Sequence, residues 1–199
     1  FIFIIYIYKT KCMAKSEEHL KGKLLFFAPN EEGSSYFTDS LIYICDHNEN
    51  GSLGLIFNRP LNLELNDLLK GMQFTDVSDI NGNVFLGGPV NPGAIFILHS
   101  SDKSWTGTLK VSKNISMSTA YEAIEDIAHG NAPKNYILTL GYTGWSPHQL
   151  QSEIADNAWI SFDENSDLIF KVDPEDQINE ISKIVGYDIR MISPNFGNA

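Results

Sequence analysis

The chain has 199 residues, of which 43% are hydrophobic, 12% aromatic and 20% charged. This composition is typical of a globular domain and excludes disordered, collagen-like and coiled-coil chains. The 14 basic and 25 acidic residues give a formal net charge of −11 without any basic cluster, which argues against nucleic acid and anionic membranes as partners.

The first twelve residues, FIFIIYIYKTKC, differ from the rest of the chain and precede Met13. Their apolar run is too short to span a bilayer, which takes about 20 residues. A secretory signal carries its positive charge before the apolar run, whereas Lys9 and Lys11 follow it here. We therefore predict that residues 1–12 are an upstream-translated leader and that residues 13–199 form one domain. An edge strand of alternating Ile and Tyr is the alternative interpretation of residues 1–12.

Short apolar runs bounded by turn residues predict strands along most of the chain. The run at residues 23–28 is continuous, which is typical of a strand buried on both faces. Asn50 and Gly51 tolerate positive φ and predict a hairpin turn between the second and third strands. The predicted strands are residues 23–28, 41–46, 53–58, 84–86, 94–98, 108–111, 136–140, 159–162 and 168–172, the last two as a closing hairpin.

Helical periodicity and capping residues predict four helices. Leucines spaced three and four apart indicate the first, at residues 65–72. Thr119 with Glu122, and Ser146 with Gln149, form capping-box patterns for the second and third. The fourth is predicted to start at Asp173 and to turn Ile178, Ile181, Ile184 and Val185 inward. Because strands occur both in hairpins and around helices, we predict a single compact α+β domain with a mixed, mainly antiparallel sheet flanked by about four helices.

Four blocks of sequence stand out in order along the chain. They are residues 22–48, GSLGLIFNRP at 51–60, GGPV at 87–90 followed by Leu98-His99-Ser100, and GYTGWSPHQL at 141–150 followed by Glu153 and residues 157–159. Together these blocks resemble the AlgH/YqgE family. The resemblance implies a compact α+β bacterial protein of the cytoplasm, from a largely uncharacterised family that is often labelled a transcriptional regulator. The acidic charge argues against direct DNA binding.

Patterns that would carry known chemistry are missing from the sequence. Gly87-Gly88-Pro89 lacks the spacing of nucleotide-binding loops and is interpreted as a tight connection between strands. The five histidines have no metal-ligand spacing, so we expect neither metal nor cofactor. His99 and Ser100 point to opposite faces of a strand and cannot form a dyad. Cys45 lies in an apolar run and, without a CxxC pair, indicates a buried thiol in a reducing cytoplasm.

Polar residues at the ends of apolar strands are the candidate binding residues, because a sheet positions the loops that follow its strands. We predict that they line one concave surface on which the Arg59 guanidinium meets an acidic partner. His47 is expected at the opposite end of the hairpin from Asn58. The candidate set is Asn58, Arg59, Gly87, Gly88, His99, Gln149 and Glu153.

The sequence leaves three functions open. The first is a non-catalytic regulatory or adaptor protein that binds an unidentified protein or small molecule. The second is an enzyme acting on a small anionic metabolite through His47, Arg59 and His99. The third, a DNA-binding regulator, conflicts with the charge.

Overall fold

The computed structural model describes residues 20–27 and 35–192. The described residues form ten strands: β1 (Leu24–Phe27), β2 (Leu41–Asn48), β3 (Gly51–Ile56), β4 (Pro60–Glu64), β5 (Asn83–Leu86), β6 (Val90–Ser100), β7 (Leu109–Lys110), β8 (Ile115–Ser118), β9 (Tyr136–Trp145) and β10 (Trp159–Phe162). They also form helices α2 (Leu65–Gly71), α3 (Tyr121–Ala128), α4 (Gln149–Ala155), α5 (Ser166–Lys171) and α6 (Gln177–Val185), and a 3-10 turn η1 (Ile189–Met191). The predicted leader, residues 1–12, lies outside the described residues.

The strands form one sheet in the order β10-β1-β2-β3-β9-β6-β8-β7. Strand β9 is the junction of this sheet, because its end at Thr143–Trp145 pairs with β3 while its earlier part pairs with β6. The earlier part also pairs with β5, in the one parallel ladder among the described strands, and β4 extends the sheet from β5. The predicted α+β fold with a mixed, mainly antiparallel sheet is confirmed.

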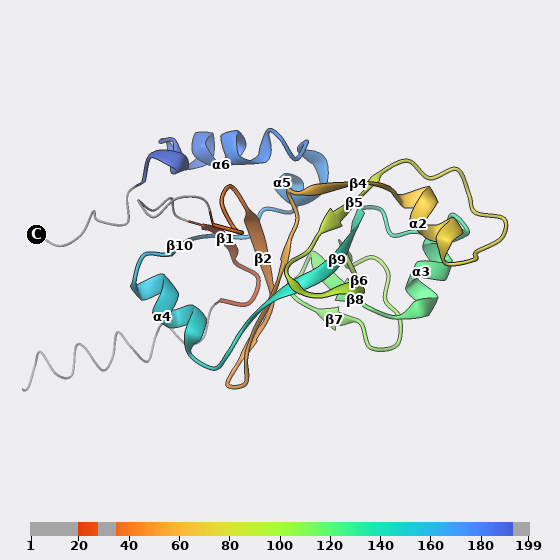
Figure 1. Cartoon of the computed structure of the whole chain (residues 1–199), viewed down its shortest axis with the longest axis horizontal. Coiled ribbons are helices and arrows are strands. Elements are labelled where there is room, and N and C mark those ends of the chain that lie inside the picture. Colours follow the sequence, from red (N-terminus) through yellow and green to blue (C-terminus); the bar gives the residue numbers. More distant parts are fainter. Residues whose placement is uncertain (1–19, 28–34, 193–199) are drawn as a thin grey trace, which may run out of the picture.

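Helices cover both faces of the sheet, as Figure 1 shows, with α5 and α6 along one side, α4 on the other beside β10, and α2 and α3 near β5. Each group of helices closes its own apolar core. Leu168 and Ile181 pack on the inner face of β1–β3, β6 and β8, α2 and α3 pack on β5, β6 and β9, and α4 packs near the tryptophans Trp145 and Trp159. In β1, Leu24 and Phe26 face one core and Leu25 another, which confirms burial on both faces.

Several local predictions are confirmed and others are wrong. The predicted hairpin between β2 and β3 is confirmed, with Glu49 and Asn50 as the turn and Asn48 paired with Gly51, one residue earlier than predicted. Residues 168–172 were predicted as a strand, but residues 168–171 belong to α5, whose first turn is capped by the Asn165 side chain accepting a hydrogen bond from the Leu168 N–H at 3.0 Å. Strand β10 therefore does not form the predicted hairpin with residues 168–172, and it pairs with β1. A short apolar run fits a buried helix as well as a strand, which explains the error.

The helix ends also differ from the prediction. Helix α3 starts after Ala120, so Thr119 is not its cap, and α6 starts only at Gln177. Half of the capping box before α4 forms, since Gln149 Oε1 accepts a hydrogen bond from the Ser146 N–H at 2.9 Å. Ile184 is 60% exposed instead of facing inward. None of the described helices is long and apolar enough to cross a membrane.

Candidate functional site

The structure does not gather the seven candidate residues on one concave surface. Asn58 and Arg59 adjoin Gly87 at the junction of the sheet, because the Ile56 N–H donates to the Gly87 carbonyl and the Leu86 N–H to the Arg59 carbonyl. Their binding role stays a prediction. His99 lies elsewhere on the sheet. Leu86 pairs with Leu140 of β9, whereas His99 pairs with Tyr136, four residues earlier on the same strand. At about 3.3 Å per residue this separates the two places by about 13 Å along the sheet.

The side chains of Asn58 and Arg59 form hydrogen bonds with the main chain before and at the start of β2. The Asn58 amide accepts a hydrogen bond from the Leu41 N–H and donates one to the Asp39 carbonyl, both at 2.8 Å. The Arg59 guanidinium donates to the main-chain carbonyls of Tyr36 and Thr38 at 2.6 and 2.8 Å, and lies 5.8 Å from the Tyr36 ring centroid. Within the described residues its hydrogen-bond acceptors are carbonyl oxygens, and the acidic partner predicted for it is not among them.

Gly87 and Gly88 lie where the chain passes from β5 to β6 against the middle of β9. A Cβ on Gly87 would lie 2.1 Å from the Gly141 carbonyl oxygen, and one on Gly88 2.2 Å from the Tyr142 carbonyl carbon. The two main chains therefore touch, which only glycine permits. The predicted tight connection between strands is what the structure has at this place.

Gln149 and Glu153 belong to a separate cluster beside α4. Glu153 Oε2 accepts hydrogen bonds from the indole N–H groups of Trp145 and Trp159 at 2.8 and 2.7 Å, and its Oε1 accepts one from the Gln149 amide at 2.9 Å. Both indoles are buried. The Glu153 carboxylate therefore supplies the acceptor that two buried indole donors need.

His99 is fully buried and belongs to a hydrogen-bonded chain. Its Nδ1 lies 3.0 Å from the Ser100 carbonyl, which can only accept, so Nδ1 carries the proton and Nε2 accepts from the Ser118 hydroxyl at 2.9 Å. Ser118 in turn is 2.7 Å from the Thr108 hydroxyl. This is the geometry of a serine–histidine dyad, but Ser118 is 1% exposed and His99 0%, so no substrate can reach the hydroxyl.

We expect the stability of the protein to fall as the pH drops below about 6.5, in a step that depends on His99. Burial lowers the pKa of His99, so the unfolded chain, with a histidine pKa of about 6.5, binds the proton more readily than the folded one. The stability is therefore complete above about pH 6.5 and is lost as the pH falls through the lowered pKa. Melting temperatures recorded from neutral to mildly acidic pH should show this step, and His99→Gln should remove it. An unchanged pH profile in His99→Gln would assign the step to other groups.

His47, Arg59 and His99 do not form a common site. His47 Nδ1 is 2.7 Å from the Ser52 hydroxyl and Nε2 is 3.1 Å from the Gln151 amide, near the turn of the β2–β3 hairpin. Asn58 and Arg59 are at the other end of that hairpin, beside Leu41, as predicted. Six residues of β2 separate the two ends, which is about 20 Å.

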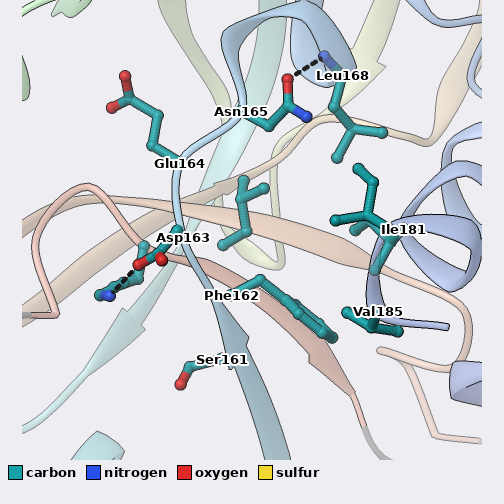
Figure 2. Close-up of a pocket in the computed structure, with 11 residues that line it drawn as sticks. Ser161, Phe162, Asp163, Glu164, Asn165, Leu168, Ile181 and Val185 are labelled. Atoms are coloured by element: carbon teal, nitrogen blue, oxygen red, sulfur yellow. Dashed lines mark hydrogen bonds and ion pairs between the residues drawn. The ribbon is translucent and has the colours of Figure 1, made fainter.

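A pocket that the sequence did not indicate opens between β10 and α6, and we call it the β10–α6 pocket. Its volume is about 540 Å³, within the range of ligand sites. Figure 2 shows Phe162, Leu168, Ile181 and Val185 turned toward one another across this space, while the carboxylates of Asp163 and Glu164 lie on the other side of the chain. None of the seven candidate residues lines it.

The rim of the β10–α6 pocket is charged and held in place. Lys23 Nζ lies 2.5 Å from Asp163 Oδ1, and this contact lowers the pKa of Asp163. The Tyr43 hydroxyl donates a hydrogen bond to Glu164 Oε2 at 2.6 Å. Burial, together with that carboxylate, raises the pKa of Tyr43, so the phenol stays protonated at neutral pH and keeps the proton that it donates to Glu164. The rim thus combines two carboxylates with one ammonium group.

The described residues hold no group of three or more His, Cys, Asp or Glu side chains arranged for a metal ion. Cys45 is buried with a free thiol, and burial raises its pKa, so the thiol is a poor nucleophile. Sequence reasoning missed the β10–α6 pocket because residues 168–172 were predicted as a strand. A signal was present, since Asn165 precedes Leu168 by three residues, the spacing of a helix N-cap.

Comparisons with known proteins support the resemblance noted in the sequence. The model of the family DUF179, described as AlgH-like, matches residues 24–190. A UPF0301 protein of Shewanella loihica is 35% identical over 185 residues, covering 92% of this chain and all of the relative. A UPF0301 protein of a Marinomonas strain is 36% identical over 183 residues, with coverages of 91% and 97%.

Two solved structures share the fold. The solution structure of the AlgH protein from Pseudomonas aeruginosa matches with a TM-score of 0.73 and 29% identity, covering 92% of this chain and 98% of that one. A crystal structure of a protein from Corynebacterium diphtheriae matches with a TM-score of 0.65 and 18% identity, covering 83% and 87%, which shows the likeness of fold alone. The family model spans most of the chain and the relatives match over nearly their full length, so this protein belongs to the AlgH-like family.

Proposed function

We propose that the protein is a non-catalytic regulatory or adaptor protein of the cytoplasm, and that the β10–α6 pocket receives an apolar side chain from a basic segment of a partner protein. The observation that carries the proposal is an apolar pocket in an acidic part of the chain, with exposed apolar residues on its wall α6 and on the segment that follows. Each of these features favours a protein partner over a metabolite.

The apolar part of the proposal rests on side chains that the monomer leaves uncovered. Ile184 lines the pocket and is 60% exposed. Tyr187 and Met191, on the segment that follows, are 51% and 80% exposed. Large exposed apolar side chains on and next to the wall of a pocket are typical of protein docking sites, because covering them removes apolar area from water.

The charge of the same region selects a basic partner. Residues 161–192 contain eight acidic and three basic residues, a net charge of −5, which is almost half of the net charge of the whole chain. Asp163 and Glu164 line the pocket, and their carboxylates lie on the side of the chain away from its apolar side chains (Figure 2). Such a field attracts a segment rich in Lys and Arg and repels acidic segments, so charge gives both a faster encounter and selectivity.

A non-catalytic role is supported by the state of the reactive groups. The Ser118–His99 pair is closed to substrate, and the buried Tyr43 phenol, bonded to Glu164, stays protonated. The alternative enzyme would need His47, Arg59 and His99 together, and these residues are held apart by their own structural hydrogen bonds.

We expect a short peptide in which Lys alternates with Leu and Phe to bind the full chain at the β10–α6 pocket. Methyl NMR signals of Leu168, Ile181, Ile184 and Val185 should shift on titration. The same peptide with Glu in place of Lys should leave them unchanged, because it meets the acidic surface with like charge.

Two matched variants test whether the peptide binds at the β10–α6 pocket. Ile184→Ser should weaken binding of the Lys peptide by at least about tenfold, or about 1.4 kcal/mol, without changing the charge or lowering the melting temperature, since the side chain is mostly exposed. Tyr121→Ser changes another exposed large hydrophobic residue to serine, on α3 far from α6 (Figure 1), and this variant should bind the peptide as the unmodified protein does. Equal binding of the Lys and Glu peptides, or equal loss in both variants, would rule out this docking site.

A further inference from the structure

A second pocket lies on the other side of α5 and is lined by lysines. Its volume is about 330 Å³, and Lys113, Lys134 and Lys171 all line it. The described residues include eleven Lys and Arg in an otherwise acidic chain, so three of them meeting at one pocket is a marked departure from the overall charge. We call it the lysine pocket.

Hydrogen bonds between neighbouring segments hold the walls of the lysine pocket. The end of β6 is joined to the starts of β8 and β9, since the Ser101 N–H donates to the Asn114 carbonyl and the Ser100 N–H to the Asn135 carbonyl, both at 2.9 Å. The Asn135 N–H donates back to the Ser100 hydroxyl at 3.0 Å. The positions of the lysines at residues 113 and 134 are therefore set by a rigid main chain, which lowers the entropic cost of binding.

The two carboxylates of the lysine pocket are already engaged. Asp167 pairs with Lys171 at 2.8 Å. Asp102 accepts hydrogen bonds from the Ser100 hydroxyl at 2.5 Å and from the Lys134 N–H at 3.2 Å, and these contacts lower its pKa. Neither acid is free to serve as the ligand of a cation, and a cation would also meet three ammonium groups.

Hydrogen-bond donors, by contrast, remain available. In the part of the chain that the structure describes, no carboxylate oxygen lies within 4.0 Å of Lys113 Nζ or Lys134 Nζ. The side-chain amides of Asn114 and Asn135 and the Ser166 hydroxyl likewise make no hydrogen bond to another described residue. The Lys134 charge contributes to the lowered pKa of Asp102, but neither ammonium group is in contact with a carboxylate of the described residues. Two such ammonium groups with neutral donors beside them fit a doubly charged oxyanion.

We propose that the lysine pocket binds a small oxyanion of the phosphate type, with Lys113 and Lys134 neutralising its two charges and Asn114 and Asn135 donating hydrogen bonds to its oxygens. This site is separate from the β10–α6 pocket, and α5 contributes residues to both. The anion would relieve the repulsion between like-charged ammonium groups.

Inorganic phosphate is the probe for this proposal. Amide NMR signals of Ser101, Asn114, Lys134 and Asn135 should shift when phosphate is added to the full chain, and an amount of sodium chloride giving the same ionic strength should not reproduce the shifts. The double variant Lys113→Gln/Lys134→Gln should weaken phosphate binding at least tenfold. Both lysines are exposed, so the melting temperature should stay that of the unmodified protein.

Lys183→Gln is the matched control, because Lys183 is an exposed lysine on α6, paired with Glu180 at 3.0 Å and outside the lysine pocket. It should bind phosphate as tightly as the unmodified chain. Shifts equal to those with chloride, unchanged affinity in the double variant, or equal weakening by Lys183→Gln would each overturn the proposal.

Discussion

Replacing Gly87 or Gly88 by alanine should lower the melting temperature by about 10 °C or more, whereas replacing Gly93 should leave it unchanged or slightly raised. An added Cβ would lie 2.1 Å from the Gly141 carbonyl oxygen at Gly87, and 2.2 Å from the Tyr142 carbonyl carbon at Gly88. Both are main-chain atoms in the middle of β9 and cannot rotate away. Overpacking costs about 1–3 kcal/mol where side chains can adjust, so we expect about 3 kcal/mol or more here.

Gly93 is the matched control because it lies on β6 and a Cβ added there would meet no other atom within 4 Å. Alanine at this position restricts the unfolded chain and adds no clash. Thermal unfolding of the three variants, followed by circular dichroism, measures the difference. Similar melting temperatures for Gly87→Ala and Gly93→Ala would contradict the close contact between the β5–β6 connection and β9.

The second large effect is expected at the Glu153 carboxylate. Glu153→Ala removes the acceptor of two buried indole N–H groups, and each unsatisfied buried donor costs about 1–3 kcal/mol. We expect a loss of about 3 kcal/mol in the free energy of unfolding and a change in tryptophan fluorescence. The fluorescence change is expected because Trp145 and Trp159 are two of the three tryptophans in the chain.

Gln149→Ala provides the comparison, because it removes a neighbour that bonds the same carboxylate but is itself exposed. Its loss should cost no more than about 1 kcal/mol. Denaturant unfolding monitored by fluorescence gives both values. If Glu153→Ala cost as little as Gln149→Ala, the carboxylate would not be what satisfies the buried indoles.

The sequence predicted those strands well that have a continuous apolar run or a clear turn signal beside them. The continuous apolar run around Leu25 forms a strand as expected, and the turn predicted at Asn50-Gly51 lies one residue earlier. Strand β8 was missed because its sequence, ISMS, alternates serine with apolar residues, and serine is not enriched in strands. Its two serines are buried through hydrogen bonds that only the tertiary structure supplies, including the one from Ser118 to His99.

The candidate site was harder to predict than the fold. The polar candidates were predicted to bind a ligand, and that role stays a prediction. In the structure Asn58 and Arg59 hydrogen-bond to main-chain carbonyls, and Glu153 hydrogen-bonds to two indoles. The sequence predicted a carboxylate partner for Arg59 and not the carbonyls of Tyr36 and Thr38. Every residue has a main-chain carbonyl, so the sequence does not indicate which of them accepts a hydrogen bond. The β10–α6 pocket depends on where α5 and α6 pack, which no local pattern specifies.

The position of α5 connects the two proposed sites. Leu168 faces the β10–α6 pocket, whereas Lys171, one turn later, faces the lysine pocket. A single short helix thus forms a wall of each, and binding at either pocket would restrict the same six residues. Partner docking and anion binding can be measured separately, because Ile184→Ser alters only the first pocket and Lys113→Gln/Lys134→Gln only the second.

Photo-cross-linking in cells tests the docking proposal most directly. A benzophenone amino acid at position 184 would sit at the mouth of the β10–α6 pocket, and the same amino acid at position 121 provides the remote control. We predict that position 184, and not position 121, cross-links to a partner protein through a segment that mass spectrometry identifies as rich in Lys or Arg with apolar neighbours. Cross-links to acidic segments, or the same products from both positions, would contradict the proposed docking site.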